Sequence, residues 1–112
     1  MELISNTNGE LQVVAVNSPR IDAALAIEFK EAMRNATDTD RPTVILDLSN
    51  VDFIDSSGLG AIVASMKHMG KDRRLVLAGL TPTVDKVFRL TRMDSVFGVF
   101  PTLESAIDAH AA

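Results

Sequence analysis

The sequence predicts a single α/β domain with a mostly parallel central sheet of about five strands and about four helices. Three observations support this fold class. Runs rich in Val, Ile and Leu alternate with stretches of helical periodicity, polar or Gly/Pro turns separate them, and 112 residues suffice for one core. The expected order is β-β-α-β-α-β-α-β-α, which requires crossover connections and therefore parallel neighbours. We see no repeat or linker, so residues 1–112 are treated as one domain.

The chain is expected to open with a hairpin. Residues 11–16, Leu-Gln-Val-Val-Ala-Val, form a compact β-branched run, and Gly9 supplies a turn before it. Residues 2–5 can pair with that run. Pro19 then ends the second strand.

The first helix and the third strand follow. Asp22 is expected to cap a helix that runs to about Ala36, because apolar residues recur there at helical spacing: Leu25, Phe29, Ala32, Met33 and Ala36. Residues 43–48, Thr-Val-Ile-Leu-Asp-Leu, are nearly all apolar, which is typical of a strand covered on both faces.

A second helix is expected after residues 55–58 and to stop at Gly70, with one apolar face made of Leu59, Ile62, Val63, Met66 and Met69. Residues 75–78 predict the next strand, and Pro82 suits the first position of a third helix capped by Thr81. The inward positions of that helix are Val84, Val87, Phe88 and Thr91. The chain is expected to close with a strand over residues 96–100 and a helix from Thr102, which places Leu103, Ala106, Ile107 and His110 on one side.

Composition argues against several classes of function. The formal net charge is −4, and the densest basic stretch, residues 71–74, contains an acid, so the chain is a poor candidate for nucleic-acid binding. Without cysteine there are no disulfides, thiolate zinc sites or thiol catalysis. The N-terminus does not resemble a signal peptide, and no apolar run approaches the roughly 18 residues of a membrane span. We expect a cytoplasmic monomer without a membrane segment, metal or cofactor.

The turn from the third strand into the second helix contains the most unusual residues. Asp55, Ser56, Ser57 and Gly58 follow one another, with Gly60 close behind. Helix capping explains one Asp or Ser at such a place and is the simpler interpretation. Two adjacent serines among glycines also leave a hydroxyl that an enzyme can approach, near backbone N–H groups that can receive an anion. These features suit a phosphoryl acceptor.

A phosphate here would change the surface more than the fold. It carries about −1.5 to −2 charges at neutral pH, and the helix N-terminus stabilises it by about 0.3–1 kcal/mol. The carboxylate of Asp55, about 6 Å away, opposes it by about 1.4 kcal/mol in water and about 5.5 kcal/mol at an effective dielectric constant of 20. A partner packed on this turn would have to desolvate the dianion, and a loss of about 3–4 kcal/mol would abolish useful binding.

The segment from Phe53 to Gly60, Phe-Ile-Asp-Ser-Ser-Gly-Leu-Gly, resembles the signature of the STAS-domain anti-sigma factor antagonists of bacteria. Weaker matches are Leu-Asp-Leu at residues 46–48 and Pro-Thr-Val at residues 82–84. The resemblance implies a regulator that, when unphosphorylated, binds an anti-sigma factor that is also a serine kinase, and thereby frees a sigma factor. It further implies a phosphatase that restores this form.

Carried over by motif, the resemblance makes Ser56 the phosphorylated residue, with Asp55 contributing to recognition and Ser57, Gly58 and Leu59 at the contact. The outward face of the second helix is expected to present small residues to the partner: Ser57, Ala61, Ala64 and Ser65, with His68 beyond them. We expect Ala61 and Ala64 to lie under the partner.

Three alternatives remain. A serine esterase using Ser56 lacks the Gly-x-Ser-x-Gly pattern, and His68 lies twelve residues further along the helix, about 18 Å away. A receiver domain phosphorylated on Asp55 needs acidic Mg²⁺ ligands after the first strand, and residues 14–20 contain none. A STAS accessory or scaffold subunit, for example of a membrane transport system, would keep the fold without the phosphorylation.

Overall fold

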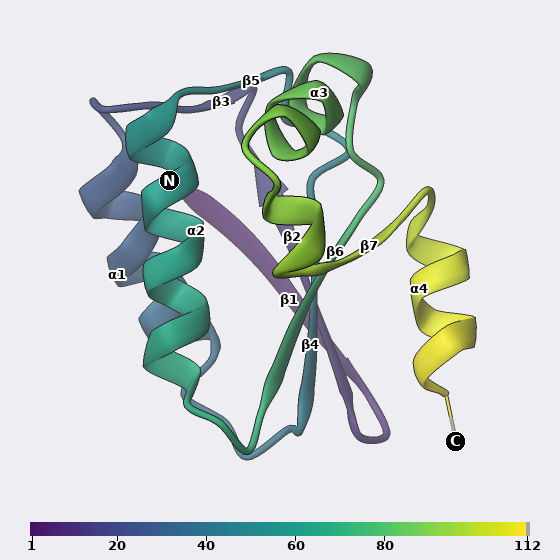
Figure 1. The fold of residues 1–112 in the computed structure, drawn as a ribbon. Helices are drawn as coiled ribbons and strands as arrows, with labels where there is room; N and C mark the ends of the chain where they lie inside the picture. Colours follow the sequence, from purple (N-terminus) through teal and green to yellow (C-terminus); the bar gives the residue numbers. More distant parts are fainter. Residues whose placement is uncertain (112) are drawn as a thin grey trace.

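The computed structural model describes residues 1–111 and contains one five-stranded mixed sheet (Figure 1). Its strand order is β1-β2-β4-β6-β7, with the strands bounded as follows: β1 (Glu2–Asn8), β2 (Leu11–Asn17), β4 (Thr43–Asp47), β6 (Arg74–Ala78) and β7 (Gly98–Phe100). The β1–β2 hairpin is antiparallel and every other pair is parallel. The predicted hairpin and parallel sheet are confirmed.

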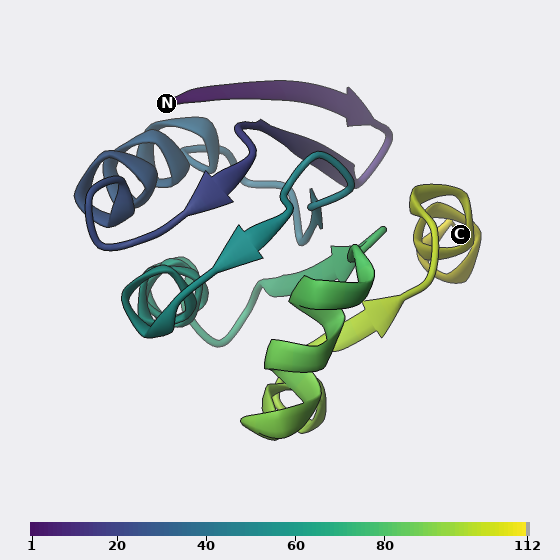
Figure 2. The same cartoon turned by 90° about the horizontal axis from the view of Figure 1, so that it is seen from above.

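Helices cover both faces of this sheet: α1 (Ala26–Ala36), α2 (Ser56–Met69), α3 (Pro82–Leu90) and α4 (Leu103–His110). Figure 2 shows α1 and α2 side by side on one face and α4 on the other. Val84 and Phe88 of α3 belong to the same apolar cluster as the inward residues of α1 and α2. No helix in residues 1–111 is long and apolar enough to cross a membrane.

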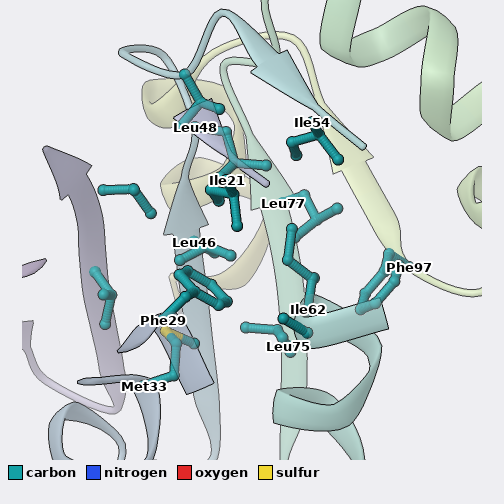
Figure 3. Packing of buried hydrophobic residues seen from close by; sticks show 14 of the residues in the cluster. Ile21, Phe29, Met33, Leu46, Leu48, Ile54, Ile62, Leu75, Leu77 and Phe97 are labelled. Atoms are coloured by element: carbon teal, nitrogen blue, oxygen red, sulfur yellow. The ribbon is translucent and has the colours of Figure 1, made fainter. Parts of the chain in front are cut away.

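Alternation along the central strands builds one core on each face. Leu46 and Leu77 face α1 and α2, where they meet Phe29 and Ile62 (Figure 3). The intervening residues, Ile45 and Val76 among them, face Ala106 of α4. Each fully buried side chain of this size contributes about 1.5–3 kcal/mol. The apolar run at residues 43–48 is therefore buried on both sides, as predicted.

A small second sheet was not predicted. Strands β3 (Arg20–Ile21) and β5 (Phe53–Ile54) pair in parallel, with Ile21 opposite Ile54. Each strand has only two residues, too few for a period-2 pattern to register. This pair holds the approach to α1 against the approach to α2, which positions the site described below.

The first helix starts later than predicted, at Ala26. Residues 22–25 form a turn instead, because the N–H of Leu25 donates to the carbonyl of Asp22 at 3.0 Å and the N–H of Ala24 donates to its carboxylate at 3.1 Å. Asp22 thus stabilises the turn before the helix. Phe29 and Met33 are buried in the core and Ala36 packs against it, as predicted, whereas Leu25 lies before the helix as its N-cap.

The final strand is also shorter than predicted and begins at Gly98. A short 3₁₀ helix, η1 (Met93–Ser95), precedes it, and the N–H groups of Val96 and Phe97 donate to the carbonyl of Met93. The ring of Phe97 packs edge-to-face on Phe88 with centroids 6.2 Å apart. That buried contact keeps residues 96–97 in the turn rather than in the strand.

Candidate functional site

The candidate site lies where β5 delivers the chain into α2. Asp55 is the N-cap of this helix, in extended conformation, and its Oδ1 accepts the N–H of Gly58 at 2.9 Å. This bond satisfies one of the free N–H groups that every helix start presents. Ser56 is consequently the first helical residue, so α2 begins earlier than predicted, since the sequence placed its start after residues 55–58.

The other carboxylate oxygen of Asp55 reaches across to the turn before α1. Its Oδ2 accepts the N–H of Ala23 at 3.0 Å, from a residue 32 positions earlier in the chain. The N–H groups of Gly58, Ala23 and Ser57 hold the pKa of Asp55 below its usual value, while partial desolvation opposes them. The two oxygens of the Asp55 carboxylate therefore join the start of α2 to the turn at residues 22–25, an arrangement we call the Asp55 clamp.

Gly58 allows these two segments to approach each other closely. A Cβ on this residue would lie 2.7 Å from the carbonyl carbon of Ile21 and closer still to its oxygen. No side chain fits there without moving β3. Gly58 is buried, so its contribution to the site is backbone and close packing.

The two serines, in contrast, face solvent. Ser56 and Ser57 are both exposed, and the hydroxyl of Ser56 makes no hydrogen bond within residues 1–111. Asp52 is also exposed nearby, and Asp22 is paired with Arg20 at 3.0 Å. The Ser56 hydroxyl is thus exposed at the first position of α2, near acidic side chains and without a hydrogen bond to the rest of the described chain.

The predicted exposure of α2 is partly wrong. Ala61 and Ser65 are buried, with 3% and 7% of their surface exposed, whereas Ala64 and His68 are exposed as predicted. The reason is that α1 packs along this side of α2, and Ser65 lies beside Met33 in the groove between the helices. A docking partner therefore cannot reach the side chain of Ala61. Leu59 is half-buried against the core.

The histidines do not complete a catalytic site with Ser56. His68 lies at the far end of α2 beside Arg34 of α1 and Thr37, the residue that follows this helix. His110 contacts the carbonyl of Ala106 at 2.8 Å through Nδ1 and packs on Phe100. Residues 1–111 contain no group of three His, Asp or Glu side chains arranged to hold a metal ion.

Sequence reasoning missed the contributions of Ile21 and Ala23, which contact the site only through backbone atoms.

Comparison with known proteins places the chain in a family. The STAS domain family model matches residues 3–106. The anti-sigma-B factor antagonist of Listeria monocytogenes is 30% identical over 80 residues, which cover 70% of each chain. The crystal structure of an anti-sigma factor antagonist from Mycobacterium paratuberculosis superposes with a TM-score of 0.86 at 28% identity, covering 96% of this chain and 92% of the other. The chain belongs to the STAS domain family.

The same fold occurs in a membrane transporter. The murine Slc26a9 anion transporter aligns with a TM-score of 0.76 and 22% identity, covering 88% of this chain but 17% of the transporter. That similarity concerns the fold alone. The predicted STAS-type architecture is confirmed by both structural comparisons.

Proposed function

We propose that this chain is an anti-sigma factor antagonist that acts by partner switching in the cytoplasm. Its unphosphorylated form binds an anti-sigma factor that is also a serine kinase, and this binding frees the sigma factor. Phosphorylation of Ser56 ends the binding, and a serine phosphatase restores it. The protein acts as a monomeric binding module, without catalysis or a cofactor of its own.

The observation that carries the proposal is a contrast between two neighbouring side chains. The hydroxyl of Ser56 makes no hydrogen bond within the described residues, whereas both carboxylate oxygens of Asp55 accept one. Both oxygens of Asp55 accept backbone N–H groups, at 2.9 and 3.0 Å, so the local structure depends on the aspartate and not on the serine. Ser56 is exposed at the first position of a 14-residue helix. A phosphate can therefore be added without breaking a bond that holds the fold.

The charge of that phosphate should weaken the binding of the partner more than it changes the stability of the fold. The helix N-terminus stabilises the dianion by about 0.3–1 kcal/mol, while the Asp55 carboxylate next to it repels it. A protein packed over Ser56 would have to remove water from both charges. A penalty of about 3–4 kcal/mol corresponds to a loss of affinity of roughly 100- to 1,000-fold.

The contact residues proposed for the partner are Ser57 and Leu59 beside Ser56, and Ala64 further along the exposed side of α2. Asp55 and Gly58 support this surface by holding its shape. The burial of Ala61 removes it from the proposed contact.

Phosphorylation by the cognate kinase tests the proposal. The purified protein, incubated with its kinase and ATP, should gain one phosphate by intact mass, and peptide mapping should locate it on Ser56. Ser57→Ala is the matched control: it removes a contact hydroxyl and can slow the reaction, but it should still gain one phosphate on Ser56, whereas Ser56→Ala should gain none. Modification of Ser56→Ala to the same extent would contradict the assignment.

A transport-associated STAS subunit is the second candidate, on the grounds of the fold shared with the transporter. It would bind no anti-sigma factor in either form, so a pull-down of the unmodified protein with the cognate anti-sigma factor separates the two.

A further inference from the structure

A basic hollow lies at the end of α1 and α2 opposite Ser56. Figure 1 shows the β3–β5 pair at the start of α2 and the loops that follow α1 and α2 together at the other end. The hollow has a volume of about 370 Å³, and its lining includes Arg34, Thr39, His68 and Arg73. A smaller adjoining hollow of about 60 Å³ adds Lys30 and shares Arg34 and His68. The larger one falls within the ~300–1,000 Å³ range of small-molecule sites.

Positive charge is concentrated there although the chain as a whole is acidic. Lys30, Arg34 and Arg73 line the two hollows together with His68, and Asp38 is the acid among the lining residues. The whole chain carries a formal net charge of −4. Neither Lys30 nor Arg34 forms an ion pair within the described residues. Their charges are thus left free for a ligand.

Arg73 is held in place by the protein itself. Its Nε donates to the carbonyl of Arg41 at 2.8 Å, its Nη1 to the carbonyl of Thr37 at 2.8 Å, and its Nη2 to Oγ1 of Thr39 at 3.3 Å. A guanidinium has five N–H donors, so donors remain on both terminal nitrogens. An anion that binds there does not have to order this side chain, which lowers the entropic cost of binding.

Stabilisation of helix ends accounts for part of this charge but not for all of it. Arg34 and His68 lie in the last turns of their helices, where cations interact favourably with the helix dipole. Lys30 lies in the middle of α1, and Arg73 comes from the loop before β6, so neither owes its position to that effect. Lys30 lines the smaller hollow and Arg73 the larger one, and Arg34 and His68 line both. Four basic side chains at two adjoining hollows indicate a ligand with several negative oxygens.

We propose that this hollow binds a small phosphate-bearing anion. The fork of Arg73 and the side chain of Arg34 match the oxygens of phosphate, and the side-chain amide of Asn35 can donate a further hydrogen bond. The hollow is lined by the ends of α1 and α2 and by the loops that follow them, and its volume of about 370 Å³ suits a small molecule rather than a peptide. The larger hollow, which holds Arg73, has no residue in common with the proposed partner contact, whereas the smaller one is also lined by Ala64 of that contact.

Titration of the full-length, ¹⁵N-labelled protein with pyrophosphate tests the site. At constant ionic strength, saturable shifts are expected at the amides of Thr37, Thr39, His68 and Arg73, while those of Ser56 and Ser57 stay in place. Arg34→Gln should weaken binding about tenfold, since it removes a charge-assisted hydrogen bond. Lys86→Gln is the matched control, because it removes one exposed positive charge from α3, and it should bind like the wild type.

Two parallel titrations distinguish the chemistry. Inorganic phosphate should bind at the same amides, more weakly, whereas citrate should bind poorly if phosphate geometry matters. Absence of saturable shifts with pyrophosphate, equal binding of citrate, or an unchanged affinity in Arg34→Gln would each overturn the proposal. Lys30→Gln provides a second variant should Arg34→Gln fail to fold. None of these results bears on partner switching, because neither Ser56 nor a protein partner enters the assay.

Discussion

Gly58 at the start of α2 lies directly against the backbone carbonyl of Ile21 in β3, so closely that a Cβ at residue 58 would be 2.7 Å from the carbonyl carbon. This contact and the Asp55 clamp join two segments more than 30 residues apart into one rigid surface beside Ser56. The motif that resembles a phosphorylation signature thus also fixes how the start of α2 packs against β3 and the turn that follows it.

Gly58→Ala should destabilise the protein by about 1–3 kcal/mol, because β3 must move to admit the methyl group. Gly60→Ala is the matched control. It lies in the same helix with nothing within 4 Å of its would-be Cβ, so the substitution should stabilise the protein by about 0.5–1 kcal/mol. Urea denaturation of both variants checks the pair. Equal effects of the same sign would refute the close approach at Gly58.

Asp55→Asn should lower stability at neutral pH and have less effect in acid. The folded-state pKa of Asp55 is depressed, so its ionised form stabilises the protein above the ordinary carboxyl pKa, and this contribution disappears as the pH falls through the folded-state value. The difference in urea midpoint between wild type and Asp55→Asn should therefore shrink on acidification from pH 7. Asp108→Asn, an exposed carboxylate on α4, serves as the control for general charge effects. A pH-independent difference would contradict the clamp.

The Ser56 hydroxyl should contribute almost nothing to the fold. Ser56→Ala is expected to change the free energy of unfolding by no more than about 0.5 kcal/mol, because the side chain is exposed and without a hydrogen-bond partner in the described structure. Thermal and urea unfolding measure this directly. A much larger loss would mean that Ser56 is a capping residue rather than a free acceptor.

Two alanines on α2 should respond differently to the same substitution. Ala64→Arg should fold normally and weaken partner binding, since this side chain is exposed beside the proposed contact. Ala61→Arg should destabilise by at least about 3 kcal/mol or prevent folding, because it forces an unpaired charge into the core. Circular dichroism and binding assays distinguish the outcomes. If Ala64→Arg binds the partner with unchanged affinity, that side of α2 is not part of the interface.

Much of the architecture follows from local sequence pattern. The continuous apolar runs at residues 43–48 and 75–78 specify strands buried on both faces, and Phe29, Met33 and Ile62 specify the inward faces of the helices. These patterns are readable because each depends on residues close together in the chain.

What could not be predicted depends on contacts between distant segments. The burial of Ala61 arises because α1 packs on α2, and small residues on several sides of α2 gave no sign of which side it would cover. Likewise, capping by Asp55 was predictable from its position, but its second bond to Ala23 requires the pairing of β3 with β5.

The central claim is tested most directly by calorimetric binding of the cognate anti-sigma factor to unmodified and Ser56-phosphorylated protein. The account predicts that phosphorylation weakens the affinity roughly 100-fold or more, while the melting temperature of the free protein barely changes. Equal affinity of the two forms, in samples shown by mass spectrometry to be fully modified and unmodified, would contradict it.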